Sequence, residues 1–271
     1  MDKIIPVGQF LPYTLEDLSV VIPQASQYVK RIKWFLPQYI KGTPKEVVKN
    51  TVVVYDPLDE ETKAVLAQYG IKGLTATPPH STYKMEAGFK SVKTRLCVRM
   101  HNDAFIKRSD WAQSLVDYFN QETSSQLVGA FNISGGIARE ILDKILIWYP
   151  NFKTIYDNLD FSNSQGLSVG APFFSAIFMA GQTYVMRDVY SLVVELNKGD
   201  MNKEDVLFTI LTSFLNIKLT NWTNLYNFVA NIGARYGDFE EGFIPPDEQF
   251  MVTEENRANF PKAEFKEVVY G

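Results

Sequence analysis

The sequence predicts an α/β fold built on a mixed, largely parallel sheet. Two runs, at residues 18–23 and 51–56, are almost continuously apolar, as expected of parallel strands that are covered on both faces. A segment with apolar residues at helical spacing follows each run, at residues 27–40 and 60–69. Strands and helices that alternate in this order are typical of βαβ units with right-handed crossovers.

The same alternation continues to about residue 120. We expect a short strand at residues 71–74, a helix at 83–92 and a buried strand at 95–100. Ser109 is the expected N-cap of the next helix. That helix has four apolar residues at helical spacing, namely Trp111, Leu115, Val116 and Phe119.

The second half of the chain is less regular. It is predicted to contain a strand at 126–132, a helical stretch at 134–148, strand character at 173–186 interrupted by Gly181, and a helix at 202–215.

From Gly237 onward the sequence becomes acidic and proline-bearing, with weak periodicity. We therefore expect one domain at residues 1–236 and, at 237–271, a C-terminal tail that wraps the domain or is partly mobile.

The composition of the chain argues against several classes of partner and location. The 271 residues are 46% hydrophobic and 21% charged with a net charge of −4, which argues against a nucleic-acid partner. The single cysteine, Cys97, excludes a disulfide within the chain and favours a reducing compartment. Without a secretory signal or an apolar stretch of about 18 residues, we expect a cytoplasmic protein with no transmembrane segment.

Two common nucleotide-binding motifs are missing from the sequence. It contains neither Gly-x-Gly-x-x-Gly nor Gly-x4-Gly-Lys-Ser/Thr, which argues against NAD binding of the usual kind and against a P-loop. Asp103 instead stands between a predicted strand and the next helix, where open α/β sheets bind ligands. It is a candidate for holding a metal ion or a polar substrate, and the alternative is an Asx-turn residue.

Six short segments carry a family resemblance. Among them, Arg99-Met100-His101-Asn102-Asp103 is similar to a strand that ends in an Asp-x-Asp signature, and Lys203-Glu204-Asp205 is similar to a Glu-Asp motif. The other four are Val20-Val21-Ile22-Pro23 and residues 52–56, 86–93 and 180–190. In their order and spacing, the six segments resemble GT-A glycosyltransferases, in particular the inverting family 2.

The resemblance implies a GT-A-like three-layer sandwich and a metal-assisted, inverting sugar transfer. The donor would be a nucleotide-diphosphate sugar, UDP-linked, and the acceptor a hydroxyl of a glycan or another molecule. Asp103 and His101 would hold Mn²⁺ or Mg²⁺, and Asp205, with Glu204 as runner-up, would be the general base. The implied nucleotide-binding residues are Pro23, Gln24, Ala25, Asp56, Lys84 and Asn102.

His101 departs from the family pattern, which has Asp at this position, and Mn²⁺ accepts imidazole more readily than Mg²⁺ does. The departure favours one alternative, a non-catalytic or weakly active nucleotide-binding protein. A second alternative is a nucleotidyltransferase, although the chain lacks a glycine-rich, Arg/Lys-bearing loop after the first strand. Structural roles also remain open: Glu204 and Asp205 suit the first turn of a helix, and His101 suits a hydrogen-bonded structural histidine.

Overall fold

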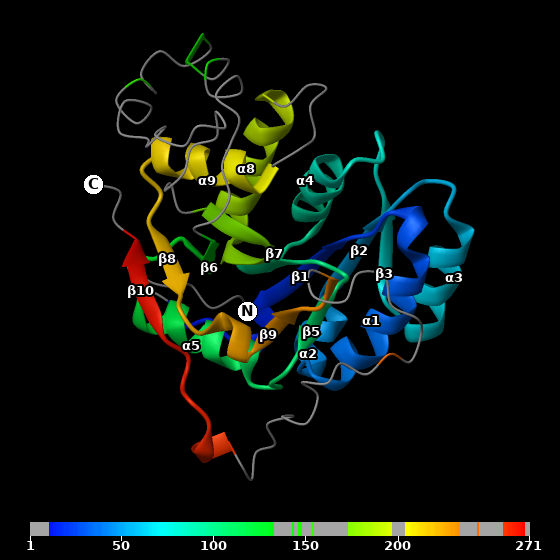
Figure 1. The fold of residues 1–271 in the computed structure, drawn as a ribbon, viewed down its shortest axis with the longest axis horizontal. Helices are drawn as coiled ribbons and strands as arrows, with labels where there is room; N and C mark the ends of the chain where they lie inside the picture. The colour runs from blue at the N-terminus through cyan, green and yellow to red at the C-terminus, as the bar shows by residue number, and fades with distance from the viewer. Residues whose placement is uncertain are drawn as a thin grey trace, which may run out of the picture.

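The computed structural model describes residues 11–132, 173–196, 204–233 and 257–268, together with the single residues 143, 146, 147, 153 and 243. Its main sheet has eight strands, in the order β10-β8-β6-β7-β4-β1-β2-β3 (Figure 1). Their bounds are β1 Leu18–Pro23, β2 Thr51–Tyr55, β3 Lys72–Thr75, β4 Leu96–Met100, β6 Leu127–Asn132, β7 Phe173–Gln182, β8 Leu219–Trp222 and β10 Phe265–Val268.

The sheet is mixed and largely parallel, as predicted. The pairs β1–β2, β2–β3, β1–β4 and β6–β8 are parallel, while β4–β7, β6–β7 and β8–β10 are antiparallel. The parallel block β3-β2-β1-β4 contains the apolar runs of the first half of the sequence, and every residue of β2 and β4 is buried. Such strands need helices on both faces.

Two helical layers supply that cover (Figure 1). One contains α1 (Val29–Lys41), α2 (Lys45–Lys49), α3 (Glu60–Tyr69) and α5 (Trp111–Gln121), and the other contains α4 (Ser81–Ser91), α8 (Thr183–Leu196) and α9 (Glu204–Phe214). The two sheet faces have separate apolar cores, one around Phe35 and Trp111 and the other around Phe89 and Tyr190. The predicted three-layer α/β architecture is confirmed.

Local sequence signals explain several boundaries. Helix α3 starts where the Asp59 carboxylate accepts a hydrogen bond from the Thr62 N–H at 2.9 Å, and it ends at Gly70, whose φ of 64° suits glycine. A separate two-stranded ribbon pairs β5 (Ala104–Ile106) with β9 (Val229–Asn231). The Gln38 side chain of α1 holds this ribbon through the Ala104 carbonyl and the Ile106 N–H, both at 2.9 Å.

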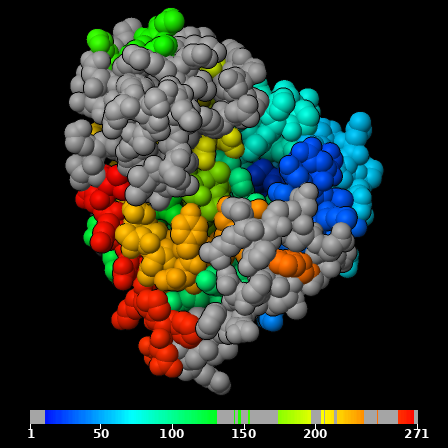
Figure 2. All heavy atoms as spheres, in the orientation of Figure 1, coloured from blue at the N-terminus to red at the C-terminus, as the bar shows by residue number. Residues whose placement is uncertain are grey.

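Some predicted elements need correction. The N-cap of α5 is Asp110, not Ser109, and residues 183–186 open helix α8 instead of continuing a strand. The helix expected at 134–148 lies largely outside the described residues. Within the expected tail, Phe265–Val268 joins the edge of the sheet beside β8, where Figure 2 shows the C-terminal residues in red. In the described part of the chain, no helix is long and apolar enough to cross a membrane.

Candidate functional site

The candidate site lies at the carboxyl edge of the parallel block. Because β1, β2 and β4 are parallel and adjacent, the residues that follow them meet at one edge of the sheet. These residues are 24–26 after β1, Asp56 after β2 and 101–103 after β4. The topology therefore brings together acidic and amide side chains that are up to about eighty positions apart in sequence.

Asp56 and Lys84 form a buried ion pair at this edge. Lys84 Nζ lies 2.5 Å from Asp56 Oδ1 and donates to the Gln24 carbonyl at 2.6 Å, and the Lys84 side chain is 2% exposed. The other Asp56 oxygen accepts the Ser26 N–H at 2.7 Å. Although burial raises the pKa of Asp56, these hydrogen bonds and the charge of Lys84 outweigh burial and lower it below its usual value. Asp56 is therefore an ionised, fixed acceptor.

Gln24 links this pair to the loop after β4. It is fully buried, its backbone N–H donates to the Val54 carbonyl at 2.8 Å, and its amide nitrogen donates to the Ala25 carbonyl at 2.8 Å. Its amide oxygen accepts a hydrogen bond from Asn102 Nδ2. The predicted residues Gln24, Asp56, Lys84 and Asn102 thus form one connected network, with Pro23 and Ala25 flanking Gln24 in the chain.

Asp103 is held at the start of the β5–β9 ribbon. Its carbonyl accepts the Ile232 N–H at 3.0 Å, and its Oδ2 lies 3.9 Å from Arg31 Nη1. Its Oδ1 is buried without a hydrogen-bond partner and lies 3.8 Å from His101 Nδ1. A Cβ on Gly233 would stand 2.3 Å from Asp103 Oδ2, so glycine is required for this carboxylate position.

Glu204 pairs with an arginine that the sequence analysis did not single out. Arg99 is fully buried on β4, and its Nη2 lies 2.6 Å from Glu204 Oε1. Arg99 also contacts His101 Nε2 at 2.9 Å and donates to Tyr190 Oη at 2.5 Å. Burial raises the pKa of Glu204, but the charge of Arg99 and its hydrogen bond lower it more, so the net shift is downward. The readable signal was a charged residue inside an apolar strand, since buried charges are paired.

Asp205 lies beside Glu204 in the first turn of α9. It interacts electrostatically with Arg99 and Tyr190. Two predicted acidic residues from the two halves of the chain, Asp103 and Glu204, are therefore linked through His101 and Arg99, and Asp205 follows Glu204 in sequence.

The residues fit a divalent cation in part. The orphaned, buried Asp103 Oδ1 is the kind of oxygen that Mg²⁺ or Mn²⁺ binds alongside substrate phosphates. The two ring nitrogens of His101 face Arg99 and Asp103, so protein side chains offer few atoms that could ligate a metal ion. In the part of the chain that the structure describes, no three His, Cys, Asp or Glu residues group into a ready metal site.

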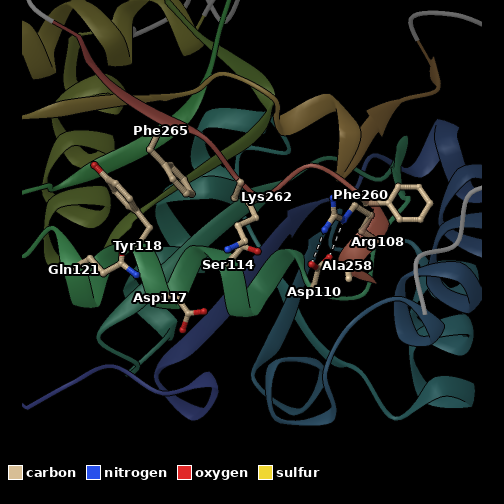
Figure 3. A pocket seen from close by; sticks show the side chains of 11 residues that line it. Arg108, Asp110, Ser114, Asp117, Tyr118, Gln121, Ala258, Phe260, Lys262 and Phe265 are labelled. Atoms are coloured by element: carbon tan, nitrogen blue, oxygen red, sulfur yellow. Dashed lines mark hydrogen bonds and ion pairs between the residues drawn. The ribbon is translucent and has the colours of Figure 1, made fainter. Parts of the chain in front are cut away.

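A hollow of about 760 Å³ lies elsewhere, between α5 and the segment 258–265 (Figure 3). Its buried charges are paired with each other, because Arg108 Nη2 lies 2.8 Å from Asp110 Oδ2 and Arg108 Nη1 donates to the Pro261 carbonyl at 2.6 Å. None of the predicted site residues lines it. We assign the candidate site to the sheet edge.

No family model and no curated protein matches the chain. Among solved structures, the chain is similar to a CMP:2-keto-3-deoxy-manno-octonic acid synthetase complexed with CTP, with a TM-score of 0.46 and 11% sequence identity over 74% of this chain and 87% of that one. A similarity of this size does not assign a reaction.

Proposed function

We propose that the chain is a transferase that binds a nucleotide-diphosphate sugar at the carboxyl edge of β1, β2 and β4 and transfers its sugar to a hydroxyl acceptor. One observation carries the proposal: two networks of buried, hydrogen-bonded polar residues meet in the loop 101–103. The first contains Asp56, and the second contains Glu204. A buried polar network destabilises the fold when some of its groups lack hydrogen-bond partners. When all of them are paired, the network holds functional groups in fixed positions.

The first network suits the nucleoside end of the donor. Asp56 is held by Lys84 and by the Ser26 N–H, so it offers ionised oxygens in a fixed direction. The ammonium of Lys84 is already engaged by two acceptors, which favours a role in holding Asp56 over direct contact with the diphosphate. The family resemblance implies that the nucleotide is UDP.

The second network suits the reacting end. In the proposed reaction the acceptor oxygen forms a bond to the anomeric carbon, the bond from that carbon to the diphosphate oxygen breaks, and the hydroxyl proton passes to Asp205. Glu204 is less suited to take this proton, because Arg99 holds its pKa down. A positioned general base typically contributes about 10² to 10⁴ in rate. Mn²⁺ or Mg²⁺ on Asp103 would offset the charge of the leaving diphosphate.

Nucleotidyl transfer is the second candidate. The observation that favours it is Arg31, which comes from the helix that directly follows the first strand's loop and lies 3.9 Å from Asp103. A guanidinium in this position suits the phosphates of a nucleoside triphosphate. The products separate the two reactions, because nucleotidyl transfer releases pyrophosphate.

The test uses the purified full chain with Mn²⁺. One arm supplies UDP-sugars, with and without simple glycan acceptors, and measures released UDP. The other supplies CTP or UTP with sugar phosphates or sugar acids and measures released pyrophosphate. Calorimetry with UDP measures binding directly.

Release of UDP that falls at least about a hundredfold in Asp205→Asn supports glycosyl transfer. Asp188→Asn is the matched control, since Asp188 is an exposed acid on α8 whose side chain is 63% accessible. Release of pyrophosphate supports the second candidate. Binding of UDP without either product identifies a non-catalytic nucleotide-binding protein, and absence of binding refutes the proposed site.

A further inference from the structure

Arg99 fixes the hydrogen-bonding state of His101. The guanidinium carries only N–H donors and accepts nothing, so His101 Nε2, 2.9 Å from Arg99 Nη2, must be the acceptor. A neutral imidazole carries one proton, which therefore lies on Nδ1. An imidazolium would carry a proton on both nitrogens and could not accept from Arg99, so the ring is neutral in this arrangement.

The ring therefore presents an N–H group toward Asp103. Nδ1 lies 3.8 Å from Asp103 Oδ1, which is too long for a hydrogen bond, and this oxygen has no hydrogen-bond partner in the structure. The His101 side chain is 30% exposed, so a ligand at the sheet edge can reach it. A metal ion needs a lone pair, and Nδ1 has none while it carries the proton.

The Arg99 side chain is itself held rigidly. It is fully buried, and its other contacts are the Tyr190 hydroxyl of α8 and the Glu204 carboxylate of α9. Ser81 of α4 donates to the same Glu204 oxygen at 3.1 Å. The guanidinium therefore connects β4 directly with α8 and α9, and Glu204 extends the connection to α4, so the direction of the bond from Arg99 to His101 is well defined.

We propose that Arg99 is a positioning residue that holds His101 as an Nδ1–H donor to a phosphate oxygen of the bound nucleotide, so that His101 is not a metal ligand. The inference rests on the proposed nucleotide site and deepens it. In this arrangement Asp103 supplies the carboxylate of the site, and His101 supplies a neutral hydrogen bond where the family pattern has a second carboxylate.

The direct test is the ¹⁵N spectrum of the full chain labelled at histidine. The sequence contains two histidines, His80 and His101, so His80→Gln assigns the remaining ring. We expect a protonated Nδ1 and an unprotonated Nε2 in His101, with the preference lost in Arg99→Met. An Nε2-protonated His101 ring in the wild-type protein overturns the inference. This measurement requires neither bound nucleotide nor the Arg99→Met variant.

Affinity for UDP provides the second test. Asn places an N–H donor near the position of Nδ1, whereas Gln places it near that of Nε2. We expect His101→Asn to bind UDP like the wild type, and His101→Gln and His101→Asp to bind about tenfold more weakly, which corresponds to about 1.4 kcal/mol.

A metal-ligating His101 predicts the opposite order, with His101→Asp binding Mn²⁺ and UDP more tightly, and that outcome overturns the inference while the nucleotide site stands. If the wild-type protein binds no UDP, the proposed function fails, and the ring spectrum still decides the state of His101.

Discussion

The Asp56–Lys84 pair allows the sharpest prediction on stability. Asp56→Asn leaves an ammonium that is 2% exposed without its counter-charge, and removing one partner of a buried ion pair costs about 3–5 kcal/mol. Lys84→Met leaves a carboxylate that is 17% exposed and keeps the Ser26 N–H, so we expect a smaller loss of about 1–3 kcal/mol. The double variant removes both charges and should lose less than the sum of the single losses.

Urea unfolding of the wild type, the two single variants and the double variant measures these losses, provided that the slope of the unfolding free energy against urea concentration is unchanged. The matched control is Lys63→Met, because the Lys63–Glu60 pair is exposed on α3 and its loss should be undetectable. UDP affinity is measured on the same proteins, and we expect it to fall in both single variants. If Asp56→Asn costs no more than Lys63→Met, or if the single losses simply add, the pair is not the buried anchor described above.

The pH dependence follows from the depressed pKa of Asp56. A carboxyl with a lower pKa in the folded state adds stability above its unfolded value of 3.8 and loses it as the pH falls through the folded value. The difference between wild type and Asp56→Asn should therefore be constant near pH 7 and shrink below about pH 4.

Four further variants test other parts of the structure. Gly233→Ala should displace the Asp103 carboxylate and weaken UDP binding in Mn²⁺ by at least about tenfold in calorimetry. Gly70→Ala, which meets no atom within 4 Å but sits at a φ of 64°, should cost about 1 kcal/mol of stability and leave binding intact. Glu204→Gln should lower the free energy of unfolding by about 3 kcal/mol, because Arg99 is fully buried, and an unchanged urea midpoint would contradict the Arg99–Glu204 pairing. Arg95 is the main cause that lowers the pKa of Asp17 to about 2. Because the pair is partly exposed, Asp17→Asn should be less stable than the wild type by under about 2 kcal/mol at pH 7. This difference in stability should disappear as the pH falls from 3.8 toward 2.

The parallel half of the sheet was predicted correctly from the sequence. Strands such as Leu18–Pro23 and Thr51–Tyr55 are apolar throughout because both faces are covered, and their boundaries agree with the prediction to within a residue. The start of α8 was missed because residues 173–186 form one long apolar run that crosses from strand into helix. The spacing of Val185, Val189 and Val193 was the readable signal of that helix, since all three are buried on one face.

The candidate site was predictable in its residue types and not in its pairings. Asp56, Asp103 and Glu204 each stand at the end of a strand or the start of a helix, which sequence pattern alone can locate. The partner of Arg99 could not be found in this way, because Glu204 is 105 positions away and only the antiparallel insertion of β7 and the packing of α8 and α9 bring it to β4. The roles of His101 and Glu204 depend on that one contact.

Charge balance at the sheet edge connects these observations. Lys84 neutralises Asp56, Arg99 neutralises Glu204, and Arg31 lies 3.9 Å from Asp103, while His101, which accepts from Arg99, carries no charge. Each of these three cations is thus matched with an acid before any ligand binds. A diphosphate brings at least two negative charges into this edge, and a hydrogen bond from His101 supplies direction without compensating charge. Asp103, with one unpartnered buried oxygen, is the residue through which a divalent cation would restore the balance, and this is why the proposed nucleotide affinity should depend on Mn²⁺ or Mg²⁺ even though His101 does not ligate it.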